Sequence, residues 1–320
     1  MNHSSTSILP GPYIQIILIA AAIPIMFLLN LAFGSVDIPF SEITKSLAGM
    51  DVEESAWSMI VMKSRLPQAF TACLAGSGLA VGGLMMQTLF RNPLAGPSIL
   101  GISSGASLGV AFVMMFVGGI QVQAIQEVGA FSNLATILAA IIGAVATLFL
   151  ILFFARKIKN NAMLLIIGIM IGYVTSALVD ILKYYSTSEY VHSYAMSGLG
   201  SFSNLAWPHL EIFIPVVLLG LALSFLLMKP LNILLLGENY AANLGINVAR
   251  VRFYIILATG LLTAVITAFC GPIVFLGLAV PHITKMLFRT SNHKYLIPGV
   301  ILIGILLALV CNFIARLPGF

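Results

Sequence analysis

Long apolar runs separated by short polar connections organise the whole chain. A helix needs about 20 apolar residues to cross a bilayer, and lipid leaves every backbone polar group to be satisfied inside the segment. The runs are too long for barrel strands, so we predict an all-α polytopic membrane protein. The predicted segments are roughly Tyr13–Phe33, two within Arg65–Gly109, Leu134–Phe154, Met163–Tyr184, Leu210–Leu227, Phe253–Phe269, Ile273–Leu287 and Leu296–Ile314.

Three local patterns add detail to these nine segments. The eighth segment is short and is interrupted by Gly277 and Pro281. A short amphipathic helix is predicted to begin at Ser41, and a second short helix is predicted from Glu238 to Leu244, ended by Gly245.

Composition supports a membrane location. Hydrophobic residues make up 60% of the 320 residues and charged residues 8%, which is too apolar for a soluble protein of this length. The net charge of +5 lies in short loops between apolar runs, so it indicates topology and not a nucleic-acid surface. A cytoplasmic N-terminus places ten of the 15 basic residues inside: Arg91, Arg156, Lys157, Lys159, Lys229, Arg250, Arg252, Lys285, Arg289 and Lys294.

Several kinds of chemistry have no support in the sequence. The chain has no GxxxxGK[ST] motif, and its segments lack the carboxylates and histidines of a proton relay, so a transporter of this kind takes its energy from a partner. Asp180 and Lys183 lie three residues apart near a helix end, where a local ion pair is expected. The three cysteines have no metal-ligand spacing and His282 stands alone, so we predict no metal site. No signal peptide is predicted, because no basic residue precedes the first apolar run.

The third segment carries small residues on two different registers. Gly101, Gly105 and Gly109 are spaced four apart, which places them on one helix face where another backbone can approach. Ser103, Ser104 and Ser107 lie between them. Helix packing alone explains this pattern, and a helix that faces a polar pathway explains it as well.

An ordered set of motifs surrounds this segment: RLPQ from Arg65, GSGLAVGG from Gly76, and QTLFRNPLAGPSILGISSGASLG from Gln87. This set resembles the FecCD family, the permeases of ABC importers for iron–siderophore complexes, haem and vitamin B12. The resemblance implies the type II importer fold with ten helices in one permease domain, here residues 1–320. Nine helices are visible, so a tenth would follow Phe320, and we favour a truncated chain over a naturally short one.

The same resemblance implies roles for the loops. The segment from Leu236 to Asn247 is similar to the family's coupling motif G-E-x-A-x-x-L-G-[IV], which docks on an ATP-binding subunit; read from composition alone, it is an ordinary connector. The matching residues are Gly237, Glu238, Ala242, Leu244 and Gly245.

The inner gate of the family corresponds here to Asn92 and Leu94, and to Asn160 with Asn161. Vitamin B12 permeases have small hydroxyl residues in the second of these loops, so the two asparagines are a departure. A solvated turn is the alternative interpretation of Asn160 and Asn161.

On the outer face, Arg65 and Arg316 match family arginines that hold acidic residues of a binding protein, whereas Gln68 replaces a third arginine. An interfacial anchor is the alternative role for each arginine. Gln87, with Met85 and Met86, joins the three serines as candidate lining of the pathway.

These expectations describe a non-enzymatic importer subunit in a bacterial cytoplasmic membrane, for ferric siderophore or haem, with cobalamin as the alternative. An ion-coupled secondary transporter and a non-transporting membrane scaffold are further alternatives. The expected partners are a second permease copy, two ATP-binding subunits, a periplasmic or lipid-anchored binding protein and membrane lipid, with no nucleic acid. No cofactor is expected in this chain, since ATP and Mg would lie on the partner subunit.

Overall fold

The computed structural model describes residues 12–34, 36–50, 54–117, 129–158 and 160–317, so Lys159 and Phe320 lie outside the described residues. All regular structure in these ranges is helical, which confirms the predicted all-α class. The helices are α1 (Pro12–Ala32), α2 (Phe40–Leu47), α3 (Ser55–Ile60), α4 (Leu66–Phe90), α5 (Ile102–Ala111), α7 (Gly129–Lys157), α8 (Asn161–Tyr184), α9 (Ser188–Ser197), α10 (Trp207–Leu226), α11 (Met228–Leu234), α12 (Glu238–Asn243), α13 (Val248–Cys270), α14 (Leu276–Phe288) and α15 (His293–Ile314).

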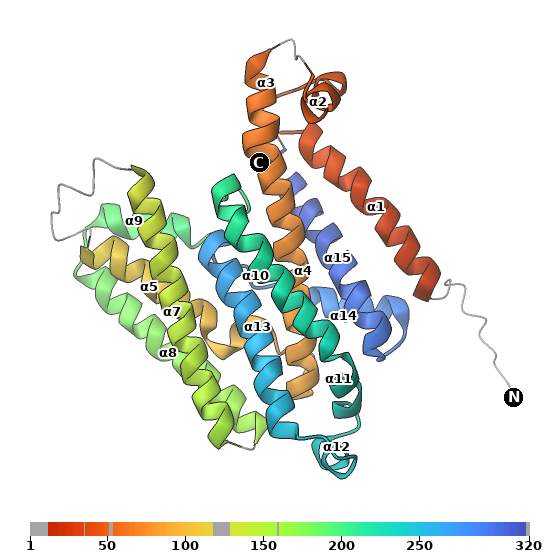
Figure 1. The fold of residues 1–320 in the computed structure, drawn as a ribbon. Helices are drawn as coiled ribbons and strands as arrows, with labels where there is room; N and C mark the ends of the chain where they lie inside the picture. The colour runs from red at the N-terminus through yellow and green to blue at the C-terminus, as the bar shows by residue number, and fades with distance from the viewer. Residues whose placement is uncertain (1–11, 35, 51–53, 118–128, 159, 318–320) are drawn as a thin grey trace, which may run out of the picture.

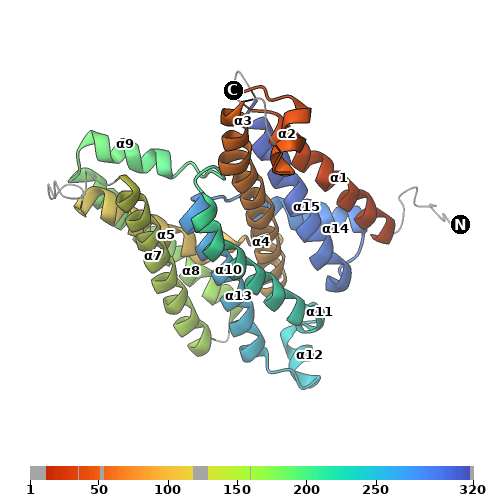
Figure 2. The same ribbon diagram turned by 45° about the horizontal axis from the view of Figure 1, so that its top comes forward.

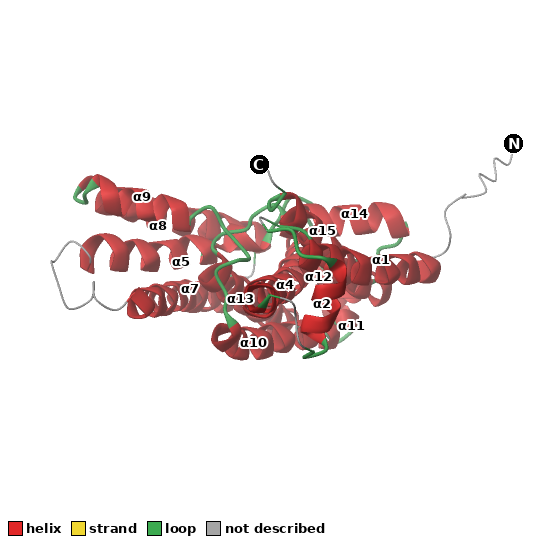
Figure 3. Cartoon of the chain, turned by 90° about the horizontal axis from the view of Figure 1, so that it is seen from above, coloured by secondary structure: helices red, strands yellow, loops and turns green. Residues whose placement is uncertain are grey.

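Helix α4 occupies the centre of the molecule and packs on α10, α13, α14 and α15. Helices α5, α7, α8 and α9 lie to one side of it, and α1, α14 and α15 lie to the other (Figures 1 and 2). The view from above shows the same two groups on either side of α4, α10 and α13 (Figure 3). In Figure 1 the short helix α12 lies at the lower end, whereas α2, α3 and α9 lie at the opposite end.

Each predicted apolar segment coincides with a helix, but two of the helices are shorter than a full span. Within the described residues, seven helices are long and apolar enough to cross a membrane, while Ile102–Met115 and Leu276–Phe288 are shorter apolar helices. The backbone explains both cases. A 3-10 turn (Pro97–Leu100) and Gly101 with φ +74° precede α5, and non-helical residues 271–275 precede α14. The eighth segment therefore begins at Leu276 and not at Ile273.

Glycines set the closest helix contacts around α4. A Cβ atom on Gly83 would lie 1.6 Å from the carbonyl oxygen of Gly277 in α14, and one on Gly76 would lie 2.3 Å from the carbonyl oxygen of Gly304 in α15. Neither site has room for a side chain, so the helices approach at backbone distance, as small residues permit in membrane proteins.

Candidate coupling site and transport pathway

Helix α12 forms the predicted short helix at the lower end of the molecule. It begins after Gly237, whose φ is +118°, and the chain turns away at Gly245, whose φ is +82°. Ala241 is fully buried and anchors the helix, while Ala242, Leu244 and Gly245 are exposed. Three of the five predicted coupling residues therefore form a small, uncharged, exposed surface on which a partner subunit could dock.

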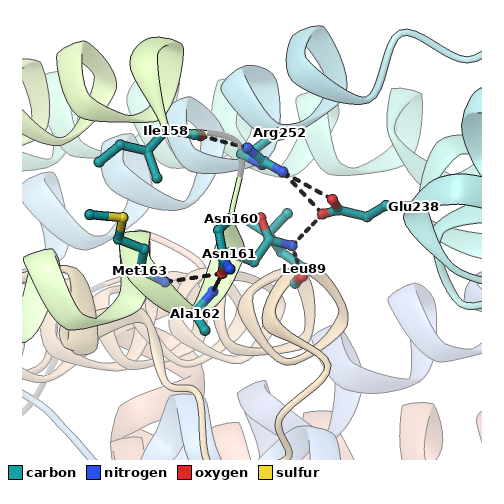
Figure 4. A network of polar contacts seen from close by, with 8 residues as sticks. All are labelled: Leu89, Ile158, Asn160, Asn161, Ala162, Met163, Glu238 and Arg252. Carbon is teal, nitrogen blue, oxygen red and sulfur yellow. Dashed lines mark hydrogen bonds and ion pairs between the residues drawn. The ribbon is translucent and has the colours of Figure 1, made fainter.

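Glu238, the first residue of α12, is held by side chains from two other helices (Figure 4). Nη2 of Arg252 in α13 lies 3.1 and 3.2 Å from the two carboxylate oxygens, and Nη1 donates to the carbonyl of Ile158 at 2.8 Å. The amide of Asn161 in α8 donates to the same carboxylate and also to the carbonyl of Leu89, at 2.8 Å. The network thus joins α12 to α13, α8 and the end of α4.

The four residues that the sequence predicts as the gate lie in two places. Asn160 caps α8 by accepting from the backbone N–H groups of Ala162 and Met163 at 2.8 and 3.2 Å, as expected of an N-cap asparagine. Asn160 and Asn161 line a hollow of about 750 Å³ together with residues 236–240, so this pair does lie beside the coupling segment.

The other two gate residues lie in the turn that follows α4. Asn92 Oδ1 accepts from the N–H of Leu94 at 2.9 Å, a local turn bond, and the Leu94 side chain is 70% exposed. Arg91 holds this turn against the segment before α12 by donating to the carbonyl of Leu235 at 2.8 Å. Neither Asn92 nor Leu94 lines the hollow beside α12.

The glycines and the serines of the small-residue helix lie in different surroundings. A Cβ atom on Gly105 would lie 2.0 Å from Thr147 Oγ1, and one on Gly109 would lie 2.0 Å from the carbonyl oxygen of Ala139, so these two glycines pack on α7. Gly101 does not share this face: it precedes α5, and a Cβ atom there would lie 3.0 Å from the carbonyl oxygen of Gly168 in α8. Ser103, Ser104 and Ser107 instead line a polar pocket of about 280 Å³.

The far wall of this pocket comes from α8 and α9. Asp180 and Lys183 form the predicted local ion pair at 3.1 Å, and the Lys183 ammonium lies 5.6 Å from the centre of the Tyr194 ring. Burial raises the pKa of Tyr194, so its hydroxyl stays protonated and able to donate. The polar part of the pocket lining therefore consists of hydroxyl groups and one ion pair whose charges cancel. Such a lining suits a polar solute and favours neither a positive nor a negative one.

Gln87 does not share this pocket, which corrects its expected placement with the serines. Its Nε2 donates to the carbonyl of Leu278 at 3.2 Å, and its Oε1 accepts from Lys285 Nζ at 3.1 Å. Met85 and Met86 are fully buried. The α4 backbone turns all three side chains into the subunit core because that helix is enclosed on nearly every side.

Arg65 has an internal role that the sequence did not indicate. Its side chain is 1% exposed, and Nη1 donates to the carbonyls of Leu31 and Ala32 at 2.7 and 2.8 Å, while Nη2 donates to that of Val36. The last carbonyls of a helix have no partner within it, so Arg65 serves as the C-terminal cap of α1. The expected exposed docking arginine is therefore not found at this position.

Arg316 is less enclosed. Its Nη1 donates to the carbonyl of Asn30 at 3.1 Å, and burial together with the nearby Arg65 charge lowers its pKa. Gln68, expected to affect docking, is also internal: its Nε2 donates to Asn312 Oδ1 at 2.9 Å, and Asn312 Nδ2 donates to Asn30 Oδ1 at 2.8 Å. This chain of amides ties α4 to α15 and α1.

Sequence reasoning also missed a member of the site. Arg252 was counted only as a basic loop residue, although it lies one helical turn into α13 and pairs with Glu238. The sequence signal for this pair was the opposite charge of Glu238 and Arg252 on either side of the short connection between α12 and α13. For α1, the signal was an uncapped C-terminus without a basic residue in its last turn.

A central helix enclosed by apolar helices, a polar pocket on one side and an exposed short helix at one end define a polytopic transport permease. The model of the FecCD transport family matches residues 22–318. The vitamin B12 import system permease protein BtuC of Klebsiella pneumoniae subsp. pneumoniae is 35% identical over 259 residues, covering 81% of this chain and 75% of that protein. The hemin transport system permease protein HmuU of Yersinia pestis is 32% identical over 294 residues, covering 91% and 85%.

A solved structure described as an inward-facing conformation of a putative metal-chelate type ABC transporter has the same fold. Its TM-score is 0.80 at 29% identity, over 94% of this chain and 90% of that one. This chain belongs to the FecCD transport family and is the permease component of an ABC importer.

Proposed function

We propose that this chain carries a ferric siderophore or haem across a bacterial cytoplasmic membrane, driven by ATP hydrolysis on a separate subunit. The observation that carries the proposal is the position of α12. Its exposed residues Ala242, Leu244 and Gly245 offer a surface to an ATP-binding partner, while Glu238 on the same helix contacts the α8 end of the bundle. Movement of a partner at this surface therefore reaches the membrane helices directly.

Topology follows from charge and helix length. Arg91, Arg156, Arg250 and Arg289 lie at helix ends on the side of α12, which supports a cytoplasmic location for that side and for the start of α1. The shorter helices α5 and α14 join the seven long ones as spans, which gives nine crossings among the described residues of a single permease domain.

The assembly comprises a second copy of this permease, two ATP-binding subunits that hold ATP and Mg, and an outer binding protein. The hydroxyl-lined pocket formed by Ser103, Ser104 and Ser107 lies on the pathway, and Asn160 with Asn161 stands at its inner end. Arg316 is the candidate contact for the binding protein, because its guanidinium is less committed than that of Arg65.

Cobalamin is the second candidate substrate. The observation that favours it is the set of relatives named as vitamin B12 permeases at 34–35% identity, against 32% for the haem permease. The two kinds of relative are similar to this chain to nearly the same degree, so the uptake experiment includes both substrates.

The test is uptake of radiolabelled ferric siderophore, haem and cobalamin by cells with and without this gene, each with ATP depleted and restored. We expect one label to be lost with the gene and to require ATP. Uptake that persists without ATP identifies an ion-coupled carrier instead. If loss of the gene changes the uptake of none of the three labels, and the protein is present and folded in the wild type, the importer function is contradicted.

A further inference from the structure

The carboxylate of Glu238 is shared between two donors that belong to different parts of the bundle. Arg252 approaches from α13, one turn after the coupling segment, and its side chain is only 4% exposed. Asn161 approaches from the first turn of α8. The two donors therefore connect the same carboxylate to helices that need not move together.

The orientation of the Asn161 amide is fixed by its partners. Both groups that its nitrogen faces, the Leu89 carbonyl and the Glu238 carboxylate, are acceptors, so a flipped amide would place oxygen against oxygen. In the assigned orientation, Asn161 Oδ1 is buried and has no hydrogen-bond donor among the described residues. An unsatisfied buried oxygen costs free energy, so a second arrangement that gives this oxygen a donor can compete with the one observed.

The two contacts of Glu238 differ in strength. Arg252 is charged and almost completely buried, so breaking its ion pair with the carboxylate is costly. Asn161 is neutral and loses only a hydrogen bond to a charged acceptor. A displacement of α12 therefore carries Arg252 and Glu238 as a pair, and Asn161 is the member that separates.

We propose that Asn161 is the positioning residue that couples α12 to the inner gate. Its contact with Glu238 holds the start of α8 against α12, its contact with Leu89 holds it against α4, and movement of α12 breaks the first of these contacts. This inference rests on the proposed function, because α12 moves only if an ATP-binding subunit docks there. It assigns the mechanical connection to Asn161 and not to its neighbour Asn160, whose side chain bonds to its own helix among the described residues.

The first test compares Asn161→Ala with Asn292→Ala, a cap asparagine outside the hollow, in the purified complex. The complex is reconstituted in liposomes with the label that the wild-type cells take up. A hydrogen bond to a charged group corresponds to a factor on the order of ten in an equilibrium constant. We expect Asn161→Ala to lower uptake per ATP hydrolysed by about tenfold with hydrolysis retained. Asn292→Ala removes the cap of α15, where Asn292 Oδ1 accepts from the N–H of Lys294 at 3.0 Å, and leaves this ratio unchanged. Equal ratios in the two variants overturn the inference.

A double-mutant cycle provides a readout that distinguishes coupling through Glu238 from a merely structural role. Glu238→Gln replaces the charged acceptor of Asn161 with a neutral amide oxygen, which accepts a weaker hydrogen bond. If Asn161 acts through Glu238, Asn161→Ala has a much smaller effect in the Glu238→Gln background than in the wild type. Independent, multiplicative effects of the two substitutions contradict the inference.

A distance measurement tests the movement itself without altering the network. Ala162→Cys and Asn239→Cys place spin labels on either side of the hollow, with Cys311 replaced by Ser because it is exposed. We expect the label distance to increase when a non-hydrolysable ATP analogue binds. An unchanged distance in a complex that transports refutes the inference alone, whereas a wild-type complex without ATP-dependent uptake refutes the proposed function as well.

Discussion

Substitution of Arg65 distinguishes a structural role from a docking role, because the first predicts a loss of stability and the second a loss of affinity for the binding protein. Its guanidinium donates to three carbonyls at the end of α1 and in the turn that follows. Arg65→Ala removes all three bonds, while Arg65→Lys keeps the charge but presents a single nitrogen that cannot reach three acceptors.

The magnitude follows from the acceptors left behind. A buried carbonyl without a partner costs about 1–3 kcal/mol, and water at the helix end recovers part of this. We therefore expect Arg65→Ala to destabilise the attachment of α1 by on the order of 3–5 kcal/mol, and Arg65→Lys by about half as much. Arg316→Lys serves as the matched control, because it loses one bond of 3.1 Å and costs about 1 kcal/mol.

Thermal unfolding in detergent and limited proteolysis between α1 and α2 measure this loss, and pull-down with the outer binding protein measures docking. The expected order of stability is wild type, Arg316→Lys, Arg65→Lys and Arg65→Ala. If Arg65→Ala is as stable as the wild type and only its affinity for the binding protein falls, the reasoning about the α1 cap is refuted.

Three further predictions use pairs of similar residues or a single buried network. Gly83→Ala places a methyl 1.6 Å from a carbonyl oxygen of α14 and should cost about 1–3 kcal/mol or more in thermal stability, whereas Gly82→Ala, whose nearest neighbour is 3.4 Å away, should be tolerated; equal melting would refute this. Asn312→Leu removes the partner of Gln68 Nε2 on α4 and of Asn30 Oδ1 on α1 and should lower stability by about 2–4 kcal/mol, measured by unfolding in detergent; a stabilised variant would contradict the amide chain. Gly245→Ala and Gly49→Ala impose similar strain of about 1–2 kcal/mol at φ +82° and +69°, but only Gly245→Ala should reduce uptake per ATP hydrolysed, and equal ratios would argue against a coupling role.

The helices were predictable because the bilayer restricts the choices. A long apolar run in lipid has to be helical, so all nine predicted segments are found as helices. The short helix α12 was also predicted, since Gly245 supplies the positive φ that ends it. The four-residue spacing of Gly105 and Gly109 predicted a close packing face, and the contact with α7 confirms it.

The partners of polar side chains were not predictable in the same way. Arg65, Gln68 and Gln87 all lie near helix ends or on a central helix, where a polar group can face water, a partner protein or an internal carbonyl. The acceptors of Arg65 lie 29–34 residues earlier in the chain, and that of Gln68 lies 244 residues later. Local sequence contains no information on such distant pairs, so surface roles were assigned to side chains that the fold uses internally.

The distribution of these internal contacts determines which part of the bundle can shift. Backbone-to-backbone contacts fix α4 to α14 and α15, and amide bonds fix it to α1 through Asn312. Helix α8 is attached differently: its glycine Gly168 rests on the turn before α5, and its first turn reaches α4 and α12 through Asn161. In the proposed coupling, Asn161 supplies the hydrogen bond between α8 and α12 at the lower end. We therefore expect a small movement of α12 to release the start of α8 while the α4 core stays intact, which lets the inner side open without unfolding the subunit.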